Sequence, residues 1–291
     1  MGPLKYFLGI EVARAPTGIF LCQHKYTLDI LTETGMLASK PSSFPMEQQH
    51  KLSSDTGDPL FDSGRYQRLI GRLIYLTITR PEITYSVHIL SQFMQDPKQG
   101  HWDAAMRLLR YLKSSPGQGI LLPASNDLRL HVYCDSDWAS YPMTRRFVTG
   151  YFVMLGAAPI SWKTKKQPTV SRSSAEAEYR AMANATKEAI WIRNLLHSLR
   201  VPVPTAQLYC DNQAPFILLL TPFFMSEPNT SKSIVILFEN GYCLGRLPLD
   251  IFLRKSSLLT SSPKLWDIDS SITYWASCAF AILMLQLEGE Y

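Results

Sequence analysis

The triplet Tyr-Cys-Asp occurs twice in this chain, and each copy closes a short run of alternating side chains. Residues 130–135 end in Asp135, and residues 207–211 end in Asp211. Because side chains alternate between the two faces of a strand, each aspartate shares a face with its tyrosine and opposes its cysteine. The pattern therefore predicts two half-buried strands that carry carboxylates at equivalent positions at their ends.

Length, charge and cysteine usage limit the kinds of protein that this chain can be. The 291 residues suffice for one large domain or two ordinary ones, and the net charge of +5 is compatible with a polyanionic partner. A net charge of this size is also typical of an ordinary solvated surface. Five scattered cysteines without metal-binding spacing are typical of a reduced, intracellular protein.

No membrane partner is expected. The most apolar run, residues 272–287, contains polar side chains and is short for a membrane span, and no secretory signal opens the chain. We interpret this run as a buried or orphaned helix, with a tail anchor as the alternative.

Hydrophobic periodicity divides the chain into a helical half and an α/β half, with a boundary near residue 124. Residues 5–24 have the pattern of one β-hairpin, in which residues 6–12 form the first strand. Helical patterns follow at residues 25–36, 65–79, 81–95 and 101–114.

The second half has a different order of elements. One strand pattern, at residues 120–122, comes just before this boundary, and the others lie at residues 130–135, 147–155, 160–163 and 206–211. A long helix is predicted at residues 173–199, begun by Ser173 or Ser174. Beyond residue 221 prolines interrupt the pattern, and no regular element is predicted there.

The long helix carries two glutamates in its first turns. Glu178 aligns with the apolar stripe of the helix, whereas Glu176 lies about 200° away and precedes Arg180 by four residues, as in a surface ion pair. A carboxylate on an apolar stripe is costly unless a cation balances it, so Glu178 is the better candidate metal ligand. The alternative is that Glu178 only occupies a helix start, where acids are favoured. Asp137 is a further candidate, as a ligand or a loop cap.

Several segments resemble the RNase H domain of copia-type LTR retrotransposon Pol polyproteins, namely residues 133–139, 161–179 and 209–212. Upstream, residues 2–12 and 66–76 resemble the C-terminal reverse-transcriptase part and its connection. The resemblance implies an α/β fold with an RNase H-like mixed sheet and flanking helices, preceded by a β-hairpin and a helical thumb or connection remnant. The implied parts are residues 1–124, 125–216 and an irregular tail, 217–291.

The resemblance also implies a site and a partner. Asp135, Glu178 and Asp211 match the family's first three catalytic, metal-binding carboxylates. Such a site would hold two Mg²⁺ ions on oxygen ligands and cleave the RNA strand of an RNA–DNA hybrid. Lys163, Lys165, Lys166 and Arg172 would contact phosphates of the hybrid or of another nucleic acid, with a solvated basic loop as the alternative. No small-molecule cofactor is expected, and the location would be cytoplasmic or nuclear.

Two departures from the family limit this expectation. The chain has no YVDD-type acidic turn and resembles an N-truncated family member, so we do not expect it to synthesise DNA. After the third aspartate the family continues with a segment like PFFHERTKHIEVDCHFVR, which holds the fourth carboxylate, whereas residues 221–239 are TPFFMSEPNTSKSIVILFE. Nuclease activity should therefore be weakened or absent. The alternatives are a nucleic-acid-binding module without catalysis and a degenerate reading frame without function.

The divergent tail is predicted to be an out-of-frame translation that begins near Ala214 and Pro215. One nucleotide string can encode residues 221–239 in one phase and the family segment in another. Sequencing the gene across these codons tests the idea. We expect the family motif in a second phase, and codons that cannot be read this way would rule the frameshift out.

Overall fold

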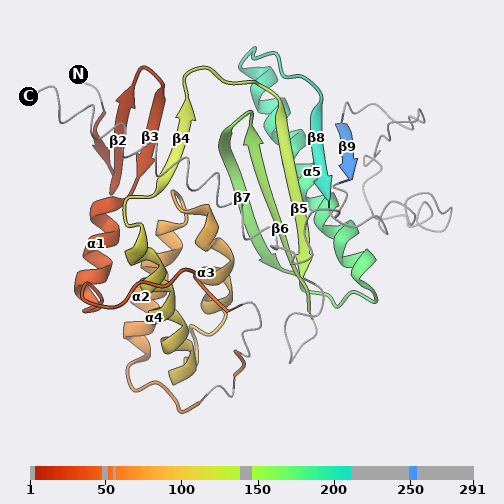
Figure 1. The fold of residues 1–291 in the computed structure, drawn as a ribbon. Coiled ribbons are helices and arrows are strands. Elements are labelled where there is room, and N and C mark those ends of the chain that lie inside the picture. The colour runs from red at the N-terminus through yellow and green to blue at the C-terminus, as the bar shows by residue number, and fades with distance from the viewer. Residues whose placement is uncertain (1–3, 48–51, 55–56, 138–145, 211–248, 254–291) are drawn as a thin grey trace, which may run out of the picture. The chain divides into compact units, whose positions relative to one another are not determined.

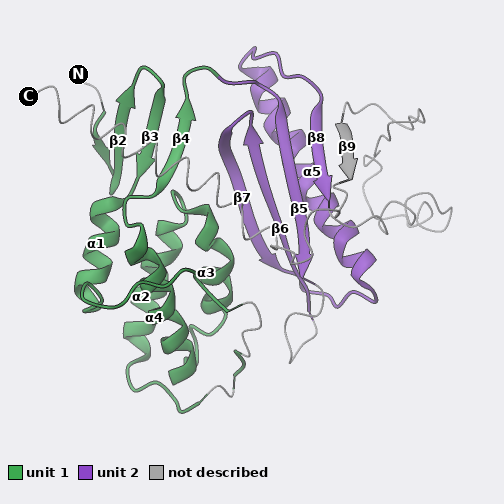
Figure 2. Cartoon of the chain, viewed as in Figure 1, with its two compact units in different colours: residues 1–125, 266–291 green, residues 126–265 purple. Residues whose placement is uncertain are grey.

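Two sheets organise the part of the chain that the computed structural model describes, which comprises residues 4–47, 52–54, 57–137, 146–210 and 249–253 (Figure 1). The described residues up to Ser125 form one compact unit, called unit 1, and those from Asn126 form unit 2 (Figure 2). Each unit has its own sheet and at least one long helix. The fold is α/β, as the sequence predicts, and no described helix has the length and apolar character needed to cross a membrane.

The sheet of unit 1 is antiparallel and has the order β1-β2-β3-β4. Its strands are β1 (Tyr6–Phe7), β2 (Ile10–Ala15), β3 (Gly18–Cys22) and β4 (Gly119–Pro123). The single strand expected over residues 6–12 is wrong, because the chain turns back between β1 and β2. Leu8 and Gly9 form this two-residue turn with φ of 48° and 79°, a backbone conformation that glycine adopts readily.

The helices of unit 1 pack their predicted apolar stripes against one another. They are α1 (His24–Glu33), α2 (Ser63–Leu76), α3 (Thr84–Ser91) and α4 (Gln99–Ser114). Asp62 caps α2 by accepting a 2.8 Å hydrogen bond from the backbone N–H of Arg65. The helix expected at residues 81–95 is shorter than predicted, since a 3₁₀ turn, η1 (Pro81–Ile83), precedes α3.

Unit 2 is built on a mixed sheet with the order β7-β6-β5-β8-β9. Its strands are β5 (Leu130–Asp137), β6 (Val148–Leu155), β7 (Ala158–Lys166), β8 (Ala206–Cys210) and β9 (Leu249–Leu253). β5 pairs parallel with β8, and β8 pairs parallel with β9, whereas the other neighbours are antiparallel. β9 lies in the tail for which the sequence predicts no regular element. Its short apolar run after a proline is nevertheless typical of a strand.

One face of this sheet is covered by α5 (Ser174–Ser198) (Figure 1). Ser173 is the helix cap and accepts a 3.2 Å hydrogen bond from the backbone N–H of Glu176. The small residues Ala181 and Ala185 lie against Val132 and other buried side chains of the sheet, which lets the helix approach the strands closely. The apolar stripe predicted for this helix is therefore the face that packs on the core.

His101 is a buried histidine that joins the start of α4 to a distant loop. Its Nδ1 accepts a 2.9 Å hydrogen bond from the backbone N–H of Lys98, and its Nε2 donates to the Ser53 carbonyl oxygen at 2.8 Å. The ring stacks on Phe93 with a centroid distance of 3.8 Å. Burial lowers the pKa of His101, partly opposed by the hydrogen bond to Ser53.

Protonation of His101 should therefore destabilise unit 1. Its pKa is lower in the folded than in the unfolded chain, so stability is full above the unfolded value of about 6.5 and falls as the pH drops below it. We expect His101→Ala to lower the free energy of unfolding by about 3 kcal/mol at pH 8, from two hydrogen bonds and a stacked ring. Urea unfolding between pH 8 and 5 measures both effects. The exposed His197 supplies the control variant His197→Ala, and equal pH dependence in the His101 variant and the parent chain would contradict the assignment.

Candidate functional site

The two Tyr-Cys-Asp triplets lie on neighbouring parallel strands, in register. Tyr133 of β5 is the partner of Tyr209 of β8. Cys134 and Cys210 are buried in the core, whereas both tyrosines are half-buried on the other face, which confirms the predicted alternation. Asp211 falls just after the last described residue of β8, outside the described residues.

The tyrosines stack on the sheet face that α5 leaves uncovered. Their rings lie 4.7 Å apart at an angle of 12°. The Tyr209 hydroxyl lies 3.1 Å from Nδ1 of His131 and donates to Oε1 of Gln207 at 2.8 Å. His131 thus packs against the tyrosine stack, and burial lowers its pKa.

This stack belongs to a row of aromatic side chains that the sequence did not reveal. Tyr133 pairs across the sheet with Phe152 of β6, and Phe152 pairs with Trp162 of β7. The row Trp162–Phe152–Tyr133–Tyr209 therefore crosses four strands at one register. The sequence shows an aromatic residue in each of these strands, but only the strand pairing shows that the four lie in one row. The row lies two residues before Asp135 along β5 and fixes the strand that carries it.

Asp135 and Glu178 both lie near the buried Cys134 thiol. A hydrogen bond with Cys210 and burial raise the pKa of Cys134 most, and the charges of Cys210, Glu178 and Asp135 raise it further. Both carboxylates are therefore within electrostatic range of one sulfur atom in β5. Glu178 is 6% exposed and lies on the core-facing stripe of α5, as predicted.

The two carboxylates approach from different sides of β5. By strand alternation Asp135 shares the face of the aromatic row, whereas α5 and Glu178 cover the Cys134 face. They can converge only at the end of the strand, where Asp137 is its last residue. Within the described residues, which do not include Asp211, no three Asp, Glu, His or Cys side chains form a metal-binding group.

Glu176 takes the surface role that was predicted for it. Its carboxylate lies 2.9 Å from Nη2 of Arg180 and accepts a 2.8 Å hydrogen bond from the backbone N–H of Arg172. These contacts stabilise the start of α5 and leave Glu178 as the glutamate that faces the sheet.

The four basic candidates are not gathered on one surface. Lys163 and Lys165 are exposed on one face of β7, and Lys166 lies half-buried on the opposite face, where burial and then Arg146 lower its pKa. Arg172 is exposed in the turn before α5. Of these residues, Lys163 and Lys165 form the only pair that shares a face of β7.

Comparison with known proteins identifies the family. No family model and no solved structure matches the chain. The chain is 46% identical over 225 residues to the retrovirus-related Pol polyprotein from transposon RE2 of Arabidopsis thaliana, which takes in 77% of this chain. The chain belongs to the copia-type retrotransposon Pol polyproteins. It spans 16% of the length of the RE2 polyprotein.

Two further relatives extend the comparison. The Pol polyprotein from transposon TNT 1-94 of Nicotiana tabacum is 32% identical over 223 residues, covering 74% of this chain and 17% of the relative. An uncharacterized mitochondrial protein of Arabidopsis thaliana is 43% identical over 192 residues, or 66% of this chain and 79% of the relative. Copia-type Pol segments of this kind therefore also match a much shorter protein.

The buried charge of Glu178 gives a direct test of cation binding. In EDTA we expect Glu178→Gln to raise the free energy of unfolding by about 1 kcal/mol, since a buried carboxylate is costly to desolvate. Millimolar Mg²⁺ should stabilise the parent chain, because a cation that binds only the folded state adds to its stability. The variant should lose this response in urea unfolding experiments.

The control for this test is Glu188→Gln on the same helix. Glu188 accepts a 2.8 Å hydrogen bond from Ser161, which glutamine can also accept. This variant should keep the parent response to Mg²⁺. An equal response to Mg²⁺ in the parent chain and in Glu178→Gln would show that Glu178 is not a ligand.

Proposed function

We propose that unit 2 is a partial RNase H-like domain that cleaves the RNA strand of an RNA–DNA hybrid with Mg²⁺, at a reduced rate. Asp135, Glu178 and Asp211 would be its catalytic and metal-binding residues. The observation that carries the proposal is Glu178, a buried carboxylate on the face of α5 that packs on the sheet whose strand β5 carries Asp135, in a member of the Pol family.

The donor chemistry suits Mg²⁺. Mg²⁺ prefers carboxylate and water oxygens, and a carboxylate buried as deeply as Glu178 is stabilised by a nearby cation. When bound, two such ions supply an activated water and stabilise the leaving oxygen. The protein's own contribution is orientation. The aromatic row holds β5, and the Ser173 cap and the Glu176–Arg180 pair hold the start of α5.

A reduced rate is proposed because the family's fourth carboxylate is not found in the reading frame of this chain. Three carboxylates can hold one ion well and a second ion poorly. Lys163 and Lys165 would then contact phosphates of the hybrid, as exposed cations on one face of β7.

Binding without catalysis is the second candidate function. The described residues contain no three-ligand metal group, while the exposed lysines of β7 remain. A binding module would retain the hybrid in a salt-dependent manner after the carboxylates are neutralised.

A labelled RNA–DNA hybrid distinguishes these functions. We expect slow, Mg²⁺-dependent cleavage of the RNA strand, no cleavage of a DNA duplex, and loss of cleavage to background in Asp135→Asn. Asparagine keeps the shape of the side chain and removes the charge that a metal ligand needs. Cleavage products resolved on a denaturing gel measure the rates.

Asp127→Asn is the matched control, since Asp127 is exposed in the same unit and precedes β5. It should cleave at the parent rate. If the parent chain and Asp135→Asn show the same cleavage, the nuclease proposal fails, and salt-dependent retention of the hybrid by both would favour the binding module.

A further inference from the structure

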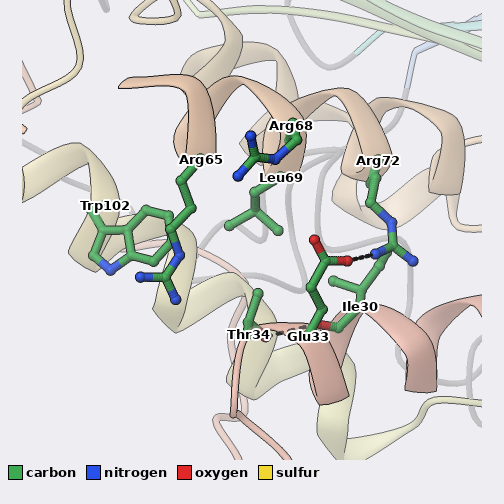
Figure 3. Close-up of a pocket in the computed structure, with 8 residues that line it drawn as sticks. All are labelled: Ile30, Glu33, Thr34, Arg65, Arg68, Leu69, Arg72 and Trp102. Atoms are coloured by element: carbon green, nitrogen blue, oxygen red, sulfur yellow. Dashed lines mark hydrogen bonds and ion pairs between the residues drawn. The ribbon is translucent and has the colours of Figure 1, made fainter. Parts of the chain in front are cut away.

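A basic depression lies on unit 1, between α1, α2 and α4. It is a shallow hollow open to solvent, and it is lined by three arginines of α2, Arg65, Arg68 and Arg72, together with Trp102 of α4 and Glu33 of α1 (Figure 3). Glu33 is the only acidic residue in its lining, so the formal charge of the lining is +3 − 1 = +2. None of these arginines belongs to the candidate site of unit 2.

Helix geometry places the three arginines in one row. Residues three and seven apart lie within about 60° of each other around an α-helix, and seven residues span about 10.5 Å of its axis. One strand of a nucleic-acid duplex carries a phosphate about every 3.4 Å of its axis. The row therefore spans about three phosphate-to-phosphate steps along one strand.

The three arginines differ in how far their contacts leave the guanidinium N–H groups able to bind an anion. Arg72 forms an ion pair with Glu33, and its guanidinium lies 5.0 Å from the ring centroid of Tyr26. Arg65 lies over Trp102 at 4.6 Å, a stacked arrangement that orients the guanidinium and leaves its N–H edge for an anion. Within the described residues, neither Arg65 nor Arg68 forms an ion pair.

The side chains of Arg65 and Arg68 both line the depression, and the Arg65 guanidinium lies beside Trp102 (Figure 3). The lining carries a net positive charge, and a bound anion would offset the repulsion among its arginines. The nearby Asp62 carboxylate is engaged in capping α2, where it binds the backbone N–H of Arg65 at 2.8 Å. The depression thus has the charge and the donors of an anion site.

We propose that Arg65 and Arg68, with Trp102 orienting Arg65, bind adjacent phosphates of a nucleic-acid backbone. This inference rests on the proposed function, because it takes the RNA–DNA hybrid as the ligand. Planar guanidinium forks bind phosphate oxygens in pairs, and a shallow open site with a row of cations suits a continuous backbone. Such contacts position the nucleic acid without selecting its sequence.

The test measures binding of a fluorescent RNA–DNA hybrid to the full chain in EDTA, so that cleavage plays no part. Arg65→Ala/Arg68→Ala should weaken binding about tenfold near 0.1 M salt and should reduce the slope of log K against log salt by about 2, from two lost phosphate contacts. Arg65→Lys/Arg68→Lys should recover the slope and only part of the affinity, because lysine keeps the charge and loses the paired geometry.

The control is Arg14→Ala/Lys25→Ala, which removes the same charge from exposed positions of unit 1 outside the depression. This variant should keep the parent slope. Equal binding by Arg65→Ala/Arg68→Ala and the control would overturn the proposal, as would arginine-dependent binding of polyglutamate without binding of the hybrid. Circular dichroism checks that each variant is folded. Arg68→Ala alone leaves the Arg65–Trp102 stack in place. It should reduce the slope of log K against log salt by about half as much as the double variant does.

This result is independent of the nuclease proposal. Loss of cleavage in Asp135→Asn with unchanged hybrid binding leaves the arginine site in place. Arginine-dependent binding by a chain that never cleaves would retain the arginine site and reject the nuclease.

Discussion

The parallel pairing of β5 with β8 governs the rest of unit 2. It sets Tyr133 opposite Tyr209, so that the tyrosines stack on one face while Cys134 and Cys210 enter the core on the other. A shift by one residue would expose the cysteines and bury the polar positions, so the register is strongly specified. The position of Asp135, and with it the candidate site, follows from this register.

α5 adds a conflict between stability and function. Its small residues pack closely on the sheet, yet the same stripe carries Glu178, whose charge is costly in the core. Buried charged groups that lower the stability of the fold are frequent in functional sites. Structural ion pairs are the other common reason for a buried charge. In unit 1, the arginine row on α2 is a second case in which charge is only partly neutralised, since Arg72 pairs with Glu33 while Arg65 stacks on Trp102.

Local pattern predicted most helices and strands, because the stripes of α2, α4 and α5 and the alternation of β5 depend on neighbouring residues. The turn at Leu8 and Gly9 was missed, since an apolar strand pattern runs through it. The aromatic row and the Arg65–Trp102 stack join segments far apart in the chain, and periodicity carries no information about such pairing. For the site, the sequence separated Glu178 from Glu176 by helix phase, but it could not show that Asp135 and α5 lie on different sides of β5.

Metal binding at the end of β5 is the central claim, and anomalous diffraction from crystals soaked in Mn²⁺ tests it most directly, because Mn²⁺ takes the same oxygen ligands as Mg²⁺. The account predicts an anomalous peak within about 2.5 Å of carboxylate oxygens of Asp135 and Glu178. A peak held only by other residues, or no peak beside these carboxylates at millimolar Mn²⁺, would contradict it.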